Sequence, residues 1–199
     1  MSTVVLSKIY KDLPFCEKEI LRYAGCKNSN DEISLLLKKC INEAKDIFSY
    51  KVCYCEAPVT INKNICDFEL IRCESEKLAL NLKGCEKAVI FAATIGVEID
   101  RLIAKYGKLS PSKALVFQAI GAERIEALCN SFCSDLEKEY TLKLKPRFSP
   151  GYGDLSLDFQ KDIFGVLDCE RKIGLTLNNS LLMSPSKSVT AIVGIGGNL

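Results

Sequence analysis

The chain has 199 residues, of which 48% are hydrophobic and 26% are charged, and its 27 basic side chains outnumber its 25 acidic ones by two. A chain of this length buries about 70% of its unfolded surface, so its core needs no disulfide or metal for support. The near-neutral charge, without a long basic run, excludes proteins whose main partner is nucleic acid or an anionic membrane. We expect a single domain over residues 1–199.

The sequence contains no histidine. This absence removes the commonest general base near neutral pH and the commonest metal ligand. Nucleophiles that histidine activates, as in Ser–His and Cys–His pairs, are therefore excluded within this chain.

Cysteine is abundant, with an odd count of eleven. The closest pairs are Cys53 with Cys55 and Cys129 with Cys133, and without a CxxC pair the signatures of zinc ribbons and thioredoxins are missing. The first ten residues lack the basic-then-apolar layout of a signal peptide, and no apolar run reaches the roughly 18 residues of a membrane span. We expect a cytoplasmic, reducing setting in which most cysteines are small buried hydrophobes.

The N-terminal part of the chain predicts two helices. The first lies between Glu17 and Gly25, where glycine tolerates the left-handed cap that ends a helix. The second begins at the capping box of Ser29 and Glu32 and reaches Phe48, because its apolar residues recur at three- and four-residue steps.

Residues 51–82 carry short runs of β-branched and aromatic side chains, with turn residues at 62–64 and 74–77. This pattern predicts an antiparallel meander. The apolar run 87–95 then predicts a central strand, and a helix is expected from Gly96 to Tyr106.

The longest predicted helix begins at Ser110 and Pro111, a hydroxyl cap followed by a proline whose missing amide costs nothing there. Its apolar stripe runs for about seven turns to Leu136 and is interrupted only at Gly121. Two cysteines lie on this stripe, so core packing is their predicted role, ahead of metal binding. A further helix is expected at 157–167, followed by strands at 173–177 and 188–195. The predicted class is α+β, a twisted antiparallel sheet with helices packed around it.

The segment 143–154, KLKPRFSPGYGD, combines proline, glycine, aromatic and arginine residues without periodicity, which predicts an ordered loop. Arg147 offers a planar fork of donors that suits a carboxylate or phosphate. Gly151 and Gly153 let the backbone approach a ligand closely, and Tyr152 adds a ring face with a polar tip. Two interpretations stay open from these residues: a ligand site, and a tight turn whose arginine makes a surface ion pair.

The run RFSPGYGD at 147–154, with FQKDIFGVLD and KIGLTLNNSLLMSPSKSVTAIVGIG downstream, resembles the activation domain of vitamin B12-dependent methionine synthase, which binds S-adenosylmethionine. The segments KEILRYAGCK, IFAATIGVEIDRLI and ALVFQAIGAERIEAL are similar to the short stand-alone members of that family. The resemblance covers nearly the whole chain.

The resemblance implies a reactivation subunit of methionine biosynthesis that is not catalytic alone. It would bind S-adenosylmethionine and support reductive methylation of cob(II)alamin. The cobalamin would be carried by a partner methionine synthase or another corrinoid protein, with a flavodoxin-type protein as electron donor. This role requires no acid–base group, which is compatible with the absent histidine.

By the same resemblance, Arg147 pairs with the ligand carboxylate, Ser149 contributes backbone contacts, and Gly151 and Tyr152 wall the site. Asp12, in KDLPF, aligns with a family aspartate that binds the amino group of the ligand. A zwitterionic ligand with a sulfonium suits a guanidinium at one end, a carboxylate at the other and a ring face between them.

Two acidic positions of the family fall on Asn130 and Thr141 in this chain. The alternative function is therefore a module that docks on a corrinoid protein but has lost S-adenosylmethionine binding. A third hypothesis, a cysteine-based redox or metal protein, rests only on the cysteine count.

Overall fold

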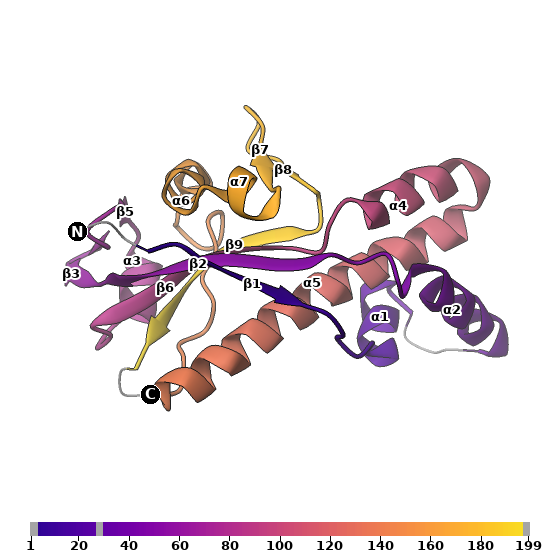
Figure 1. Ribbon diagram of the computed structural model, residues 1–199, viewed down its shortest axis with the longest axis horizontal. Coiled ribbons are helices and arrows are strands. Elements are labelled where there is room, and N and C mark those ends of the chain that lie inside the picture. The colour runs from indigo at the N-terminus through magenta and orange to yellow at the C-terminus, as the bar shows by residue number, and fades with distance from the viewer. Residues whose placement is uncertain (1–3, 27–29, 197–199) are drawn as a thin grey trace.

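The computed structural model describes residues 4–26 and 30–196. At its centre lies a four-stranded antiparallel sheet in the order β1-β2-β6-β9 (Figure 1). Its strands are β1 (Leu6–Tyr10), β2 (Tyr50–Pro58), β6 (Lys87–Thr94) and β9 (Ser188–Ile195). Helices pack on both faces of this sheet, so the predicted α+β class with antiparallel pairing is confirmed.

Strand β6 is apolar along its length because both of its faces are covered. Val89 and Phe91 point into the core on the side of α5 (Pro111–Tyr140), whereas Ala88 and Ile90 point into the core on the opposite side. The prediction of a central strand in the run 87–95 is confirmed.

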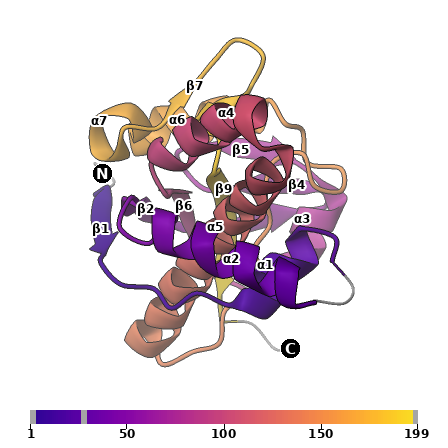
Figure 2. The same ribbon diagram turned by 90° about the vertical axis from the view of Figure 1, so that its right-hand side faces the viewer.

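One face of the sheet is covered by α5, with three further helices gathered at one end of it (Figure 2). These helices are α1 (Glu17–Tyr23), α2 (Asp31–Ala44) and α4 (Glu98–Leu109). As predicted, α5 begins at Pro111 and buries an apolar stripe. Gly121 interrupts that stripe because the stem of Lys187 crosses the helix there: a Cβ at Gly121 would lie 2.9 Å from Lys187 Cε.

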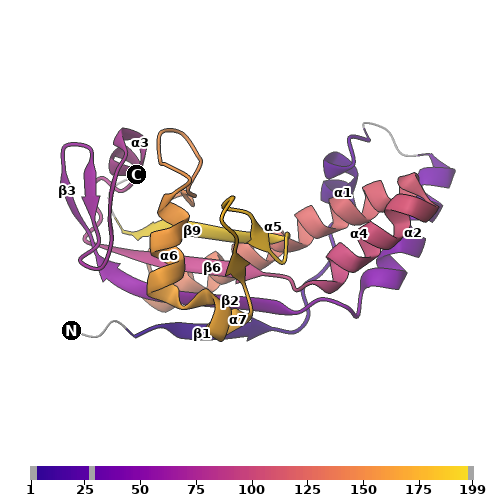
Figure 3. The same ribbon diagram turned by 90° about the horizontal axis from the view of Figure 1, so that it is seen from above.

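The opposite face carries the C-terminal helices, and a second, smaller sheet lies at the end of the central sheet away from α1, α2 and α4 (Figure 3). The elements on this side are α6 (Phe159–Leu167), α7 (Cys169–Ile173), and the hairpin of β7 (Thr176–Leu177) with β8 (Met183–Ser184). The smaller sheet contains β3 (Thr60–Asn62), β4 (Ile65–Asp67) and β5 (Arg72–Glu74), and α3 (Glu76–Asn81) follows it.

The meander expected over residues 51–82 is correct only for β3, β4 and β5. Strand β2 instead pairs with β1 and β6 in the central sheet, and the turn expected at 74–77 is the start of α3. Ser75 caps this helix, since its hydroxyl accepts a hydrogen bond from Leu78 N–H at 3.0 Å. A serine followed by charged residues is typical of both turns and helix caps, so the local sequence did not separate them.

Three other elements differ from expectation. Helix α2 is capped by Asn30 and ends at Ala44, while the expected cap Ser29 lies outside the described residues. The strand expected at 173–177 shrinks to the two residues of β7, because α7 continues to Ile173. Strand β1 was not predicted. Helices α1, α4 and α6 lie within a few residues of their expected places, and β9 has its expected bounds.

Seven of the eleven cysteines are buried, three are half-buried and Cys16 is exposed, which confirms that most serve as small buried hydrophobes. Within residues 4–26 and 30–196, no helix is long and apolar enough to cross a membrane. The same residues contain no group of three or more histidine, cysteine, aspartate or glutamate side chains placed to hold a metal ion.

Candidate functional site

Arg147 is bound to α5. Its Nη2 lies 2.7 Å from Glu126 Oε2, and 25% of its side chain is exposed. Its Nη1 is buried and has no hydrogen-bond partner among the described residues. Because a guanidinium presents five donors, Arg147 keeps the capacity to bind a further acceptor. The ion-pair interpretation of this arginine is therefore correct but incomplete.

A buried thiol lies beside the guanidinium. Cys129, three residues after Glu126 on α5, lies near Arg147, and burial raises the pKa of its thiol to about 12. The positive charge of Arg147 acts against this shift of the Cys129 pKa.

The backbone around Arg147 is fixed by the central sheet. Phe148 N–H donates to Ile192 O at 2.9 Å, and Ile192 N–H donates back to Phe148 O at 2.8 Å. On the other side, Asn81 Nδ2 donates to Pro146 O at 3.3 Å. Arg147 is thus presented by a rigid support between the edge of β9 and α5.

The turn that follows is compact. Tyr152 N–H donates to Ser149 O at 3.1 Å, and Gly151 N–H donates to Leu155 O at 2.9 Å. Gly151 has a φ of +84°, in the left-handed region that favours glycine. The Tyr152 ring stands edge-on to Phe148 with 5.2 Å between ring centroids, and 66% of Tyr152 is exposed. The tyrosine is therefore oriented yet still accessible.

Asp154 fastens the end of this turn to α3. Its carboxylate accepts hydrogen bonds from Ser75 Oγ at 2.5 Å and from Glu76 N–H at 2.8 Å. These bonds, that from Ser75 above all, hold the pKa of Asp154 below its ordinary value. The turn is anchored at both ends, by β9 before it and by α3 after it.

The two residues that follow Asp12 are hydrogen-bonded to α5, the helix that also carries Glu126. The carbonyl oxygens of Leu13 and Pro14 each accept a 2.6 Å hydrogen bond from the buried guanidinium of Arg124 on α5. The Asp12 side chain itself is exposed, and among the described residues no hydrogen bond or ion pair joins it to the turn after Arg147. The structure therefore places Asp12 near α5 but does not bring it into contact with the other predicted residues.

A hollow of about 490 Å³ lies between α1 and α5. Its lining includes Leu13, Pro14, Glu19, Arg22, Glu123, Glu126 and Asn130. The partner of Arg147 and the segment after Asp12 thus line one cavity. Each carboxylate of this lining already has an arginine partner: Glu19 pairs with Arg22 at 2.7 Å, Glu123 with Arg124 at 2.5 Å, and Glu126 with Arg147 at 2.7 Å. The hollow is therefore polar, with its negative charges balanced.

The structure gathers the four predicted residues of the loop in one turn. Of the two positions where the family has acids, Asn130 lines the hollow, while Thr141 is exposed at the left-handed cap that ends α5. Sequence reasoning missed Glu126. No local signal identified it, because its side chain is 43% exposed and its partner lies 21 residues further along the chain.

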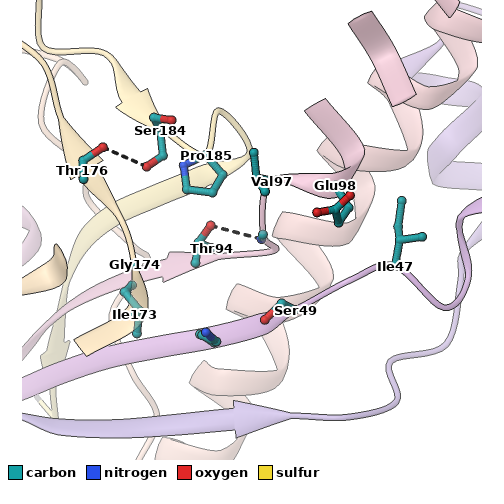
Figure 4. Close-up of a pocket in the computed structure, with 12 residues that line it drawn as sticks. Ile47, Ser49, Thr94, Val97, Glu98, Ile173, Gly174, Thr176, Ser184 and Pro185 are labelled. Atoms are coloured by element: carbon teal, nitrogen blue, oxygen red, sulfur yellow. Dashed lines mark hydrogen bonds between the residues drawn. The ribbon is translucent and has the colours of Figure 1, made fainter. Parts of the chain in front are cut away.

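A second hollow, of about 430 Å³, lies where β2 begins and β6 ends, beside the β7–β8 hairpin (Figure 4). Thr176 and Ser184 contribute one wall, where Thr176 Oγ1 donates to Ser184 O at 3.2 Å. Lys51, Thr94 and Glu98 contribute to the others. This lining mixes one lysine, one carboxylate, hydroxyls and apolar groups, so it does not indicate one ligand class.

No protein-family model matches this sequence, and no curated protein matches it. Among solved structures, the crystal structure of the MetH reactivation domain bound to AdoHcy matches with a TM-score of 0.72. This chain has the fold of the MetH reactivation domain. The match covers 96% of this chain and 78% of that chain at 13% sequence identity, so the resemblance expected from the motifs is confirmed at the level of fold. Within this reactivation-domain fold, we call the Arg147 turn, Glu126 and the hollow between α1 and α5 the candidate site.

Proposed function

We propose that this chain is a reactivation module that binds S-adenosylmethionine and supports reductive methylation of cob(II)alamin on a cobalamin-dependent methionine synthase. The observation that carries the proposal is the buried, unpartnered Nη1 of Arg147, in a fold shared with a domain crystallised with AdoHcy. A buried donor without an acceptor costs free energy, and a ligand carboxylate would satisfy it.

The residues of the candidate site fit a zwitterionic ligand with a large planar group. Arg147 would hold the carboxylate, and Asp12 would attract the amino group, as the resemblance implies. The exposed ring of Tyr152 offers a surface for an aromatic base or a positively charged sulfonium. Ser149 and Gly151 would contribute backbone groups, because glycine allows close approach.

S-adenosylmethionine supplies the methyl group when bound, and a corrinoid partner carries the cobalt that receives it. The residues of this chain would bind and orient the ligand, and none of them has to move a proton. This division of roles agrees with a sequence that lacks histidine. A flavodoxin-type electron donor and a cytoplasmic location belong to the same proposal.

One observation favours the alternative, a corrinoid-docking module without S-adenosylmethionine binding. Glu126 already pairs with Arg147, and its carboxylate competes with that of a ligand. A module that only docks would co-purify with a corrinoid protein and produce no heat when titrated with S-adenosylmethionine.

Isothermal titration of the full chain with S-adenosylmethionine, and separately with AdoHcy, tests the proposal. We expect saturable binding by the wild type and roughly 10- to 100-fold weaker binding by Arg147→Ala, because hydrogen bonds to charged groups contribute about 1.5–3 kcal/mol. Arg171→Ala is the matched control, since it removes an exposed arginine paired with Asp168 at 2.6 Å on the other side of the sheet. Equal affinities of the two variants, or no heat from the wild type at millimolar ligand, would contradict the proposal.

A further inference from the structure

Cys66 and Cys73 form a cross-strand pair of thiols. They stand directly opposite each other in the antiparallel register of β4 and β5. Opposed residues of antiparallel strands project to the same face with Cα atoms about 4.5–5.5 Å apart. A disulfide spans Cα distances of about 4.4–6.8 Å, so this pair can be bridged without moving the backbone.

The two thiols differ in accessibility. Cys66 is fully buried, whereas Cys73 is half-buried and lines a surface hollow of about 400 Å³. Ser156 and Phe159, from the segment that leads into α6, contribute to the other walls of this hollow. A small reagent in the hollow therefore meets Cys73 first, and Cys66 lies behind it.

The two thiols also titrate together. The interaction of each thiol with the other lowers the pKa of Cys66 and raises the pKa of Cys73. The pair thus gives up its first proton more easily than its second, and one thiolate is shared between two sulfurs. The thiolate is the form that attacks a disulfide.

A second close pair of cysteines shows that two thiols can lie near each other without being accessible to a reagent. The Sγ atoms of Cys53 on β2 and Cys169 on α7 lie 4.0 Å apart, but these residues are only 0% and 1% exposed. Neither lies at the surface, so a reagent in solution has no direct approach to them. The contrast singles out Cys66 and Cys73 among the close cysteine pairs of the described chain.

We propose that Cys66 and Cys73 are a thiol–disulfide exchange site that reacts with low-molecular-weight disulfides, RSSR. Cys66 ionises first and takes up the proton of Cys73. The more accessible Cys73 sulfur, now a thiolate, attacks one sulfur of RSSR, which forms a Cys73–S–S–R mixed disulfide and releases RS⁻. Cys66 then loses its proton and attacks the Cys73 sulfur, which forms the Cys66–Cys73 disulfide and releases the second RS⁻. The protein loses two electrons and two protons, and RSSR becomes two molecules of RSH.

The position of the pair connects this site to the turn after Arg147. Ser75, two residues after Cys73, holds the Asp154 carboxylate that closes the turn. A disulfide would tie β4 to β5 directly before this contact. The exchange site does not depend on the proposed S-adenosylmethionine binding, so the two proposals can fail separately.

The test uses the full chain, reduced and then incubated without oxygen in excess oxidised glutathione. Free thiols are alkylated after denaturation and every cysteine is mapped by peptide mass spectrometry. We expect one protein disulfide, between Cys66 and Cys73, with the other buried cysteines alkylated and a glutathione adduct on the exposed Cys16. Cys66→Ala is expected to stop at the glutathione adduct on Cys73, and Cys73→Ser to form neither product. Cys133→Ser, which removes another half-buried thiol, is the control and should leave the disulfide unchanged.

The wild-type map decides the outcome even where a buried cysteine variant folds poorly. A wild-type chain in which Cys66 and Cys73 are both alkylated would overturn the proposal. A persistent glutathione adduct on wild-type Cys73 beside an alkylated Cys66 would also overturn it, because Cys66 would then not resolve the adduct. A Cys53–Cys169 disulfide in a chain whose Cys73 remains free would count against it equally.

Discussion

Glu123 and Arg124, adjacent on α5, form a two-point ion pair inside the core, with Nε to Oε2 at 2.6 Å and Nη2 to Oε1 at 2.5 Å. Arg124 is fully buried, and its guanidinium lies 4.0 Å from the centre of the Phe15 ring. The same guanidinium holds the carbonyl oxygens of Leu13 and Pro14. The pair therefore fastens the segment after Asp12 to the helix that carries Glu126.

Arg124→Met is expected to lower the free energy of unfolding by about 3–5 kcal/mol, because it leaves Glu123 buried without its partner. Urea denaturation measures this change. Adding Glu123→Leu should recover much of the loss, since the unpaired charge is then gone. Arg171→Met, at an exposed pair, should cost less than about 1 kcal/mol. A double variant as unstable as Arg124→Met alone would refute the unpaired-charge explanation.

Glu126→Gln tests whether the ion pair with Arg147 restrains the candidate site. An amide competes less than a carboxylate for the guanidinium, and partly exposed pairs contribute about 0.2–1 kcal/mol. We therefore expect the affinity for S-adenosylmethionine to rise by up to about fivefold in the titration described above. Glu137→Gln is the control. Glu137 lies farther along α5, and its exposed carboxylate accepts a hydrogen bond from Leu144 N–H, beyond the end of the helix. Weaker binding by Glu126→Gln would indicate instead that Glu126 holds the ligand.

The contact of Asp154 with Ser75 predicts a pH dependence of stability. The hydrogen bond from Ser75 lowers the pKa of the folded carboxyl below the ordinary 3.8. A carboxyl with a lowered folded pKa stabilises the fold above its unfolded pKa, and this contribution is lost as the pH falls through the folded pKa. The difference in unfolding free energy between wild type and Asp154→Ala should be constant near neutral pH and shrink below about pH 4.

Denaturation at a series of pH values measures this difference. In a Ser75→Ala background the effect of Asp154→Ala should be smaller at every pH, because the main donor to the carboxylate is missing. A wild-type advantage that persists undiminished to about pH 2 would contradict the assignment of this pH dependence to Asp154.

Gly151→Ala is expected to cost about 1–2 kcal/mol, because an alanine must adopt the left-handed conformation that Gly151 has. The added Cβ would also lie 3.2 Å from Leu157 Cδ1. Gly165→Ala is the matched control, since nothing lies within 4 Å of a Cβ there and the residue belongs to α6. That control should be neutral or stabilise by up to about 1 kcal/mol. Equal effects of the two substitutions in thermal denaturation would argue against strain in the turn.

The elements predicted correctly from sequence are those whose pattern is set by burial along one segment. The stripe of α5 and the two-sided apolar run of β6 are of this kind. Strand β1 and the partner of Arg147 depend on residues far apart in the chain. Lys8 of β1 is held at 2.5 Å by Asp135, which is 127 residues away, and Glu126 precedes Arg147 by 21. Composition located the turn of the candidate site, but no local pattern specified its partner.

Phe148 exchanges two backbone hydrogen bonds with Ile192, so the stretch that bears Arg147 behaves as an additional short strand beside β9. Its amide should resist solvent deuterium about as long as its neighbours in the sheet do. Fraying of β9 and displacement of the arginine are then a single event. A partner that binds at this edge of the sheet would therefore respond to both changes together.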